Sequence, residues 1–126
     1  MIVESVELKD YRNYEFLDMN FNEHVNIIYG DNAQGKTNIL ESIYMCSTSK
    51  SHRGSKDREI VRFGEDESHI KLNVLKHGMK YRIDMHLKKN KTKGIAVNGI
   101  PIKKAVELFG IINICLLYTS PSPRDS

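Results

Sequence analysis

The chain has 126 residues, of which 40% are hydrophobic and 28% charged, and its formal net charge at pH 7 is +3. This length accommodates one domain, and so small a charge does not by itself indicate a nucleic-acid partner. No apolar run approaches the roughly 20 residues that cross a bilayer, and the first residues lack the features of a secretory signal. We therefore expect a cytoplasmic protein that has no membrane partner.

The first part of the chain predicts three strands. Apolar and polar residues alternate at 6–9 and again at 17–21, and residues 10–13 have the composition of a turn, so a β-hairpin is the simplest arrangement. Residues 25–29 form a more continuously apolar run. Such a run is typical of a central strand that is covered on both faces.

A phosphate-binding loop is predicted directly after this run. The pattern G-x-x-x-x-G-K-T is formed by Gly30, Asp31, Asn32, Ala33, Gln34, Gly35, Lys36 and Thr37. Its glycines let the backbone approach a triphosphate, so that amides of residues 32–37 point at phosphate oxygens. We assign Lys36 to the β- and γ-phosphates of the triphosphate and the Thr37 hydroxyl to Mg²⁺. The alternative is a Gly-rich turn that caps a helix, but the predicted strand before it and helix after it favour the nucleotide site.

A helix is predicted from Lys36 to about residue 47. Its sheet-facing side is expected to carry Ile39, Leu40, Ile43, Tyr44 and Ser47. The polar residues 47–56 predict a loop, and a short helical turn is expected at 57–63 with Ile60 and Phe63 packed inward.

The remaining chain predicts an antiparallel meander and a tail. Strands with one solvated face are expected at 69–74, 81–87, 94–97 and 100–102, with turns at His77-Gly78 and Asn98-Gly99. A short helix follows at 103–109, in which Ala105, Val106 and Phe109 cluster and which Gly110 ends, and a strand-like run follows at 111–117. We expect residues 1–115 to form the folded part and 116–126 to be a disordered or non-native tail.

Six lysines are candidates for contact with the DNA backbone. They are Lys88, Lys89, Lys91, Lys93, Lys103 and Lys104. The first four equally fit a solvated hairpin tip. Because no aromatic residues are interleaved among them, duplex or junction contact is favoured over a single-strand stacking platform. The five histidines show no paired metal-ligand spacing and are expected to be surface or local hydrogen-bonding residues.

Four segments together resemble the bacterial RecF family of recombination mediators. They are residues 8–14, 26–44, 50–53 and 57–60. The resemblance implies an α/β fold, the N-terminal lobe of a P-loop NTPase of the ABC ATPase head type, with a mixed sheet, an antiparallel meander and a truncated end. It also implies binding of ATP, Mg²⁺ and DNA that is gapped or has a single-strand/double-strand junction. Further implied are an ATP-dependent homodimer, the partners RecO and RecR, and roles in gap repair, replication-fork recovery and SOS induction.

The resemblance also carries over to individual residues. Arg12 and Asn13 match an early basic turn that lies near the nucleotide in related heads, and residues 50–53 match a segment near nucleotide or DNA. The acidic Walker B strand and the signature loop of such heads do not occur here, so no catalytic residue is assigned and little hydrolysis is expected. Two alternatives are a non-hydrolysing DNA-binding or structural P-loop fragment and a small P-loop kinase.

Overall fold

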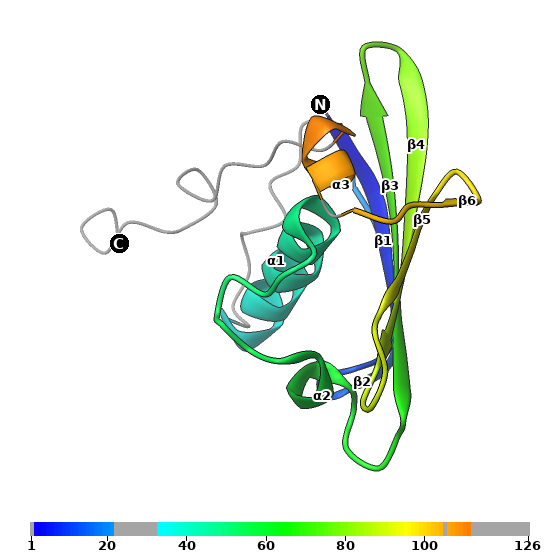
Figure 1. Ribbon diagram of the computed structural model, residues 1–126. Helices are drawn as coiled ribbons and strands as arrows, with labels where there is room; N and C mark the ends of the chain where they lie inside the picture. The colour runs from blue at the N-terminus through cyan, green and yellow to red at the C-terminus, as the bar shows by residue number, and fades with distance from the viewer. Residues whose placement is uncertain (1, 22–32, 105, 112–126) are drawn as a thin grey trace.

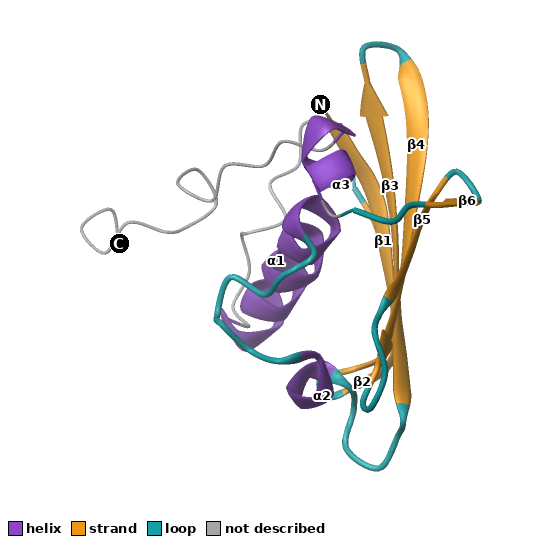
Figure 2. Ribbon diagram, viewed as in Figure 1, coloured by secondary structure: helices purple, strands orange, loops and turns teal. Residues whose placement is uncertain are grey.

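The structure is an antiparallel sheet with helices packed on one of its faces (Figures 1 and 2). The computed structural model describes residues 2–21, 33–104 and 106–111. In chain order the elements are β1 (Ile2–Tyr11), β2 (Tyr14–Asn20), α1 (Ala33–Thr48), α2 (Asp57–Ile60), β3 (Glu67–Lys76), β4 (Met79–Lys88), β5 (Gly94–Val97), β6 (Ile100–Pro101) and α3 (Val106–Ile111).

The sheet has the strand order β2-β1-β3-β4-β5-β6, and each pair is antiparallel. The predicted first hairpin and the predicted meander are therefore confirmed. In the turn between β3 and β4, His77 and Gly78 both have positive φ, as do Asn98 and Gly99 between β5 and β6. Such φ values match the twist of hairpin turns, which explains why these dipeptides fix the register.

Alternating residues divide the sheet into an inner and an outer face. On the inner side of β3 and β4, Ile70, Leu72, Ile83 and Met85 are at most 1% exposed. Their neighbours in sequence on the outer face are mostly polar and partly or fully exposed. Burying one such aliphatic side chain stabilises the fold by roughly 1.5–3 kcal/mol, so the inner face holds α1 against the sheet.

Helix α1 buries more residues than the one apolar face that the sequence predicts. Ile39, Ile43 and Ser47 are buried as predicted, but Leu40 and Tyr44 are only half-buried, so that part of the prediction is wrong. The buried residues also include Asn38, Glu41, Ser42, Met45 and Cys46. The reason is that α1 contacts the sheet and α3, and the loop after it folds back alongside.

Two predictions about short helices are also wrong. Phe63 is 97% exposed, because α2 ends at Ile60 and the helical period does not continue past it. Among the side chains of α3 that the structure describes, Leu108 is buried and Val106 is 70% exposed, whereas the predicted partners Ala105 and Phe109 lie outside them. The helix also continues through Gly110 to Ile111, which we had predicted to begin a strand.

Several predicted segments lie outside the described residues, namely the strand at 25–29, the run after Ile111 and the tail at 116–126. Within the described part of the chain, no helix is both long enough and apolar enough to cross a membrane.

Candidate functional site

A buried carboxylate organises the region around the first half of α1. The Glu41 side chain is fully buried and accepts hydrogen bonds from four side chains of two other segments. The donors are Tyr11 Oη at 2.8 Å, Arg12 Nε at 3.0 Å and Nη2 at 2.6 Å, Ser51 Oγ at 2.5 Å, and Arg53 Nη1 at 3.4 Å. Glu41 therefore joins the end of β1, helix α1 and the loop after α1.

The network keeps Glu41 ionised although it is buried. Burial alone would raise the pKa of Glu41, but hydrogen bonds from Arg12, Ser51 and Tyr11 outweigh it, and the pKa lies below its ordinary value. The hydrogen bond with Glu41 raises the pKa of Arg12. Burial, followed by the Glu41 charge, raises the pKa of Tyr11 well above 10, so its hydroxyl stays protonated and donates to Glu41.

The turn that carries Arg12 is held by backbone hydrogen bonds to α2 and the residues after it. Asp10 and Arg12 have φ values of 51° and 56°, in the left-handed region that non-glycine residues rarely adopt. The Arg12 N–H donates to the Ile60 carbonyl at 2.7 Å, and the Arg62 N–H donates to the Asp10 carbonyl at 2.8 Å. These bonds fix the direction in which Arg12 leaves the turn.

A polar cavity of about 420 Å³ opens beside this network. Its lining residues are Arg12, Asn13, Asn38, Arg53, Arg58, Glu59, Val61, Phe63 and Lys89. Within it, Arg53 Nη1 donates to Asn38 Oδ1 at 3.0 Å, and Asn38 Nδ2 donates to Asn13 Oδ1 at 3.4 Å. Four cationic side chains line the cavity, whereas the nearby carboxylates are Glu59 in the lining and the buried Glu41 behind Arg12 and Arg53. The remaining excess of positive charge favours an anionic ligand.

The cavity is next to the predicted phosphate loop in sequence, because Asn38 directly follows Thr37. Arg12 and Asn13, which the family resemblance placed near a nucleotide, come together here with Asn38 and Arg53. Arg12 and Asn13 therefore line the same cavity as the residue that directly follows the predicted phosphate loop. Arg53 belongs to the predicted 50–53 segment, of which Ser51 is bound to Glu41 while Lys50 and His52 are exposed.

The phosphate loop itself is described only in part. Gly30, Asp31 and Asn32 lie outside the described residues, the backbone of residues 33–36 forms the first turn of α1, and Thr37 is half-buried in that helix. The phosphate contacts assigned to these residues stay a prediction.

The six lysines proposed for DNA occupy different environments. Lys88, at the end of β4, and Lys89, in the turn that follows, are half-buried, and Lys91 of the same turn is exposed. Lys93 is 19% exposed, and its Nζ lies 3.0 Å from Asp57 Oδ1 and donates to the Ser49 carbonyl. Lys103 and Lys104, beyond β6, are exposed. DNA contact by these lysines stays a prediction.

Sequence patterns did not identify Glu41 as a functional residue. In the run Ile-Leu-Glu-Ser-Ile a single glutamate is typical of the solvated side of an amphipathic helix. The sequence feature that could have indicated Glu41 is the pair of cationic residues Arg12 and Arg53, because they need a buried counter-charge if they approach the helix.

A known protein family matches most of this chain, including the residues of the site. The model of the family described as "AAA domain" matches residues 5–115, which is most of the chain. The chain belongs to the AAA domain family. Its members' fold agrees with the predicted P-loop ATPase class, which is thereby confirmed.

Individual relatives are RecF proteins. The chain is 93% identical over 125 residues to the DNA replication and repair protein RecF of Lachnospira eligens, covering 99% of this chain and 33% of that protein. It superimposes on a solved structure of the recombination mediator protein RecF-ATP with a TM-score of 0.77 and 37% identity, over 86% of this chain and 30% of that one. The resemblance to RecF is thus confirmed, and the chain spans about a third of the length of these relatives.

A more distant likeness concerns the fold alone. The SMC head domain from Thermotoga maritima matches with a TM-score of 0.66 and 19% identity, over 88% of this chain and 41% of that chain. The fold is therefore shared with the SMC head domain.

Proposed function

We propose that this chain is the nucleotide-binding part of a RecF-type DNA replication and repair ATPase, and that it binds ATP with Mg²⁺. The observation that carries the proposal is a basic cavity lined by Arg12, Asn13, Asn38 and Arg53, in which Asn38 directly follows the G-K-T sequence and is hydrogen-bonded to Asn13 and Arg53. The similarity to a RecF protein solved with ATP supports the same ligand.

The residues present fit a magnesium nucleotide. A triphosphate is polyanionic, and the cavity supplies the guanidinium groups of Arg12 and Arg53 beside the helix that follows the phosphate loop. Lys36 and the loop amides would hold the phosphates, and the Thr37 hydroxyl would be a ligand of Mg²⁺, an ion that prefers oxygen donors. Mg²⁺ supplies charge neutralisation of the phosphates when it is bound.

The cellular role follows from the RecF relatives. We infer that the complete protein acts in the cytoplasm on gapped or junction DNA, with RecO and RecR, in gap repair, replication-fork recovery and SOS induction. An ATP-dependent homodimer would complete the nucleotide site from a second molecule. In this dimer the chain would bind the nucleotide. Hydrolysis would also need a Walker B strand and a signature loop.

The antiparallel strands favour this role over a small P-loop kinase. A kinase needs an acceptor pocket and a mobile lid after its first helix, whereas here β3, β4 and β5 form a continuous part of the sheet. The non-hydrolysing DNA-binding fragment differs from the preferred proposal in predicting no specific ATP affinity.

Calorimetric titration of the 126-residue chain with ATP and Mg²⁺ tests the proposal. Wild-type protein is expected to bind, and Lys36→Ala is expected to lose roughly ten- to hundredfold in affinity, because it removes a charge-assisted contact worth about 1.5–3 kcal/mol. The matched control is Lys80→Ala, which removes an exposed lysine of β4. Equal ATP affinity of wild type and Lys36→Ala would contradict the assignment.

A further inference from the structure

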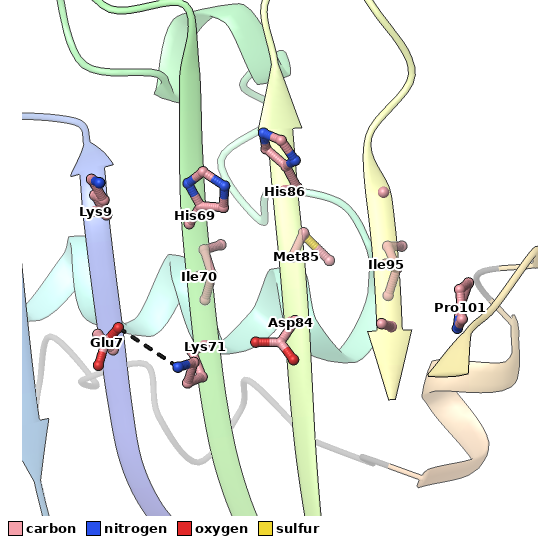
Figure 3. Close-up of a pocket in the computed structure, with 12 residues that line it drawn as sticks. Glu7, Lys9, His69, Ile70, Lys71, Asp84, Met85, His86, Ile95 and Pro101 are labelled. Carbon is pink, nitrogen blue, oxygen red and sulfur yellow. Dashed lines mark ion pairs between the residues drawn. The ribbon is translucent and has the colours of Figure 1, made fainter. Parts of the chain in front are cut away.

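A second cluster of side chains, which carry possible metal ligands, lies on the outer face of the sheet. It consists of Glu67 and His69 of β3 and His86 of β4. The strand register puts His69 directly opposite His86, and Glu67 lies two residues before His69, hence on the same face of β3. Figure 3 shows the two imidazole rings on neighbouring strands, with α1 behind the sheet.

The three side chains are close enough to share one ion. The imidazole rings stack with centroids 4.1 Å apart and planes inclined by 23°. His86 Nε2 lies 2.5 Å from Glu67 Oε1, and one ligand atom from each residue lies within 4.8 Å of the other two. Ligand atoms of a tetrahedral zinc ion are roughly 3.3 Å apart, given bonds of about 2.0 Å. The side chains of Glu67 and His86 are 53% and 33% exposed, so they have room to rotate toward a shared ion.

We propose that Glu67, His69 and His86 form a binding site for a divalent transition-metal ion of the zinc class. Two imidazole nitrogens and one carboxylate oxygen are a ligand set that suits Zn²⁺, Co²⁺ and Ni²⁺. Mg²⁺ prefers oxygen ligands throughout, so this site is chemically distinct from the magnesium position proposed at Thr37. The proposal is independent of nucleotide binding, because the cluster and α1 lie on opposite faces of the sheet.

The surroundings leave room for an ion and its water. Gly94 of β5 pairs with His86, and no atom lies within 4 Å of where its Cβ would be. His69, His86 and Gly94 all line an open cavity of about 500 Å³. A water molecule can therefore complete the coordination of an ion held by the three protein ligands.

Neighbouring charges limit the affinity. Lys9 of β1 pairs in register with His69, and Lys88 of β4 pairs with Glu67. Their positive charges oppose a divalent cation, and the site is partly open to solvent, so we expect a dissociation constant in the micromolar range. Because the ligands come from two strands, bound metal would cross-link β3 to β4 and raise the melting temperature.

Metal titration of the full 126-residue chain tests the proposal. Zn²⁺ binding is measured by calorimetry, and Co²⁺ binding by visible absorption, which reports the ligand type. Wild-type protein is expected to bind one ion per chain, and His69→Gln, His86→Gln and Glu67→Gln are each expected to weaken binding at least tenfold. The matched control is His77→Asn, which removes a histidine in the β3–β4 turn and is expected to leave the affinity within twofold.

A further variant retains all three ligands. Lys9→Gln removes the opposing charge and is expected to tighten Zn²⁺ binding roughly fivefold at low salt. Equal affinity in wild type and the His69→Gln and His86→Gln variants would overturn the proposal, as would the absence of saturable binding or no gain in Lys9→Gln. A thiolate-to-cobalt charge-transfer band would also overturn it, because a cysteine would then hold the ion.

Discussion

Arg12 Nη2 lies 2.6 Å from Glu41 Oε2, although the two residues are 29 positions apart in the sequence. Arg12 precedes the predicted phosphate loop and Glu41 follows it. The ion pair therefore joins the two chain segments on either side of residues 30–37. Under the proposed function, Arg12 would serve both nucleotide binding and the stability of this part of the fold.

Replacing Glu41 should strongly destabilise the protein. Glu41→Gln leaves the guanidinium groups of Arg12 and Arg53 without their buried counter-charge, and breaking a buried pair on one side costs about 3 kcal/mol or more. Urea unfolding measures this loss. Glu65→Gln, whose side chain is 45% exposed and lies 3.8 Å from Arg62, should change the free energy of unfolding by less than about 0.5 kcal/mol. An equal loss of unfolding free energy in Glu41→Gln and Glu65→Gln would show that the Glu41 network contributes no more than an exposed ion pair.

The same carboxylate predicts a dependence of stability on pH. The pKa of Glu41 is lower in the folded protein than its ordinary value of 4.5. The stability that ionised Glu41 contributes is therefore complete above about pH 4.5 and is lost as the pH falls toward the folded-state pKa. Between about pH 6 and pH 3, wild-type protein should lose more free energy of unfolding than Glu41→Gln does. Parallel profiles would contradict the lowered pKa.

Lys93 should contribute to stability through the loop after α1. Its ammonium contacts Asp57 at the start of α2 and the carbonyl of Ser49 at the end of α1. Lys93→Met removes both contacts and should lower the free energy of unfolding by about 1–2 kcal/mol. Lys91→Met, at an exposed position of the same turn, is the matched control and should have little effect. No difference between the two would support the solvated-tip alternative for Lys93.

The other lysines at the β4–β5 connection are expected to make a salt-dependent contact with DNA. They are Lys88 at the end of β4 and Lys89 and Lys91 in the turn. Replacing Lys88, Lys89 and Lys91 together with glutamine should reduce the slope of log affinity against log salt by about 0.9 per lysine that contacts a phosphate. The measurement is fluorescence anisotropy with a gapped duplex at several salt concentrations. Lys80→Gln controls for the general effect of charge. An unaltered slope would leave these lysines as a solvated tip.

Most of the sheet could be predicted from the sequence, because alternation and turn residues are local signals. The His77-Gly78 turn determines that His69 pairs with His86, whereas spacing along the chain predicts only surface or local hydrogen-bonding histidines. Their proximity is visible only once the hairpin register is applied to the outer face. Spacing along the chain, which identifies metal ligands on one helix or loop, cannot show pairs on two strands.

The errors concern residues whose environment depends on distant segments. Phe63 was expected to pack inward, but a helical period predicts nothing after α2 ends, and the side chain is 97% exposed. Glu41 was missed because its partners come from the end of β1 and from the loop after α1. The phosphate-loop motif can be recognised in the sequence because its residues are consecutive in the chain.

In the proposed function, the basic cavity and the phosphate loop together bind the phosphates of a nucleotide. The most direct measurement is calorimetric binding of ATP, ADP, AMP and adenosine to the wild-type chain in the presence of Mg²⁺. If lysine, arginine and loop amides supply the affinity, each phosphate removed should weaken binding roughly ten- to hundredfold. Adenosine binding as tightly as ATP, or no binding of either, would contradict the account.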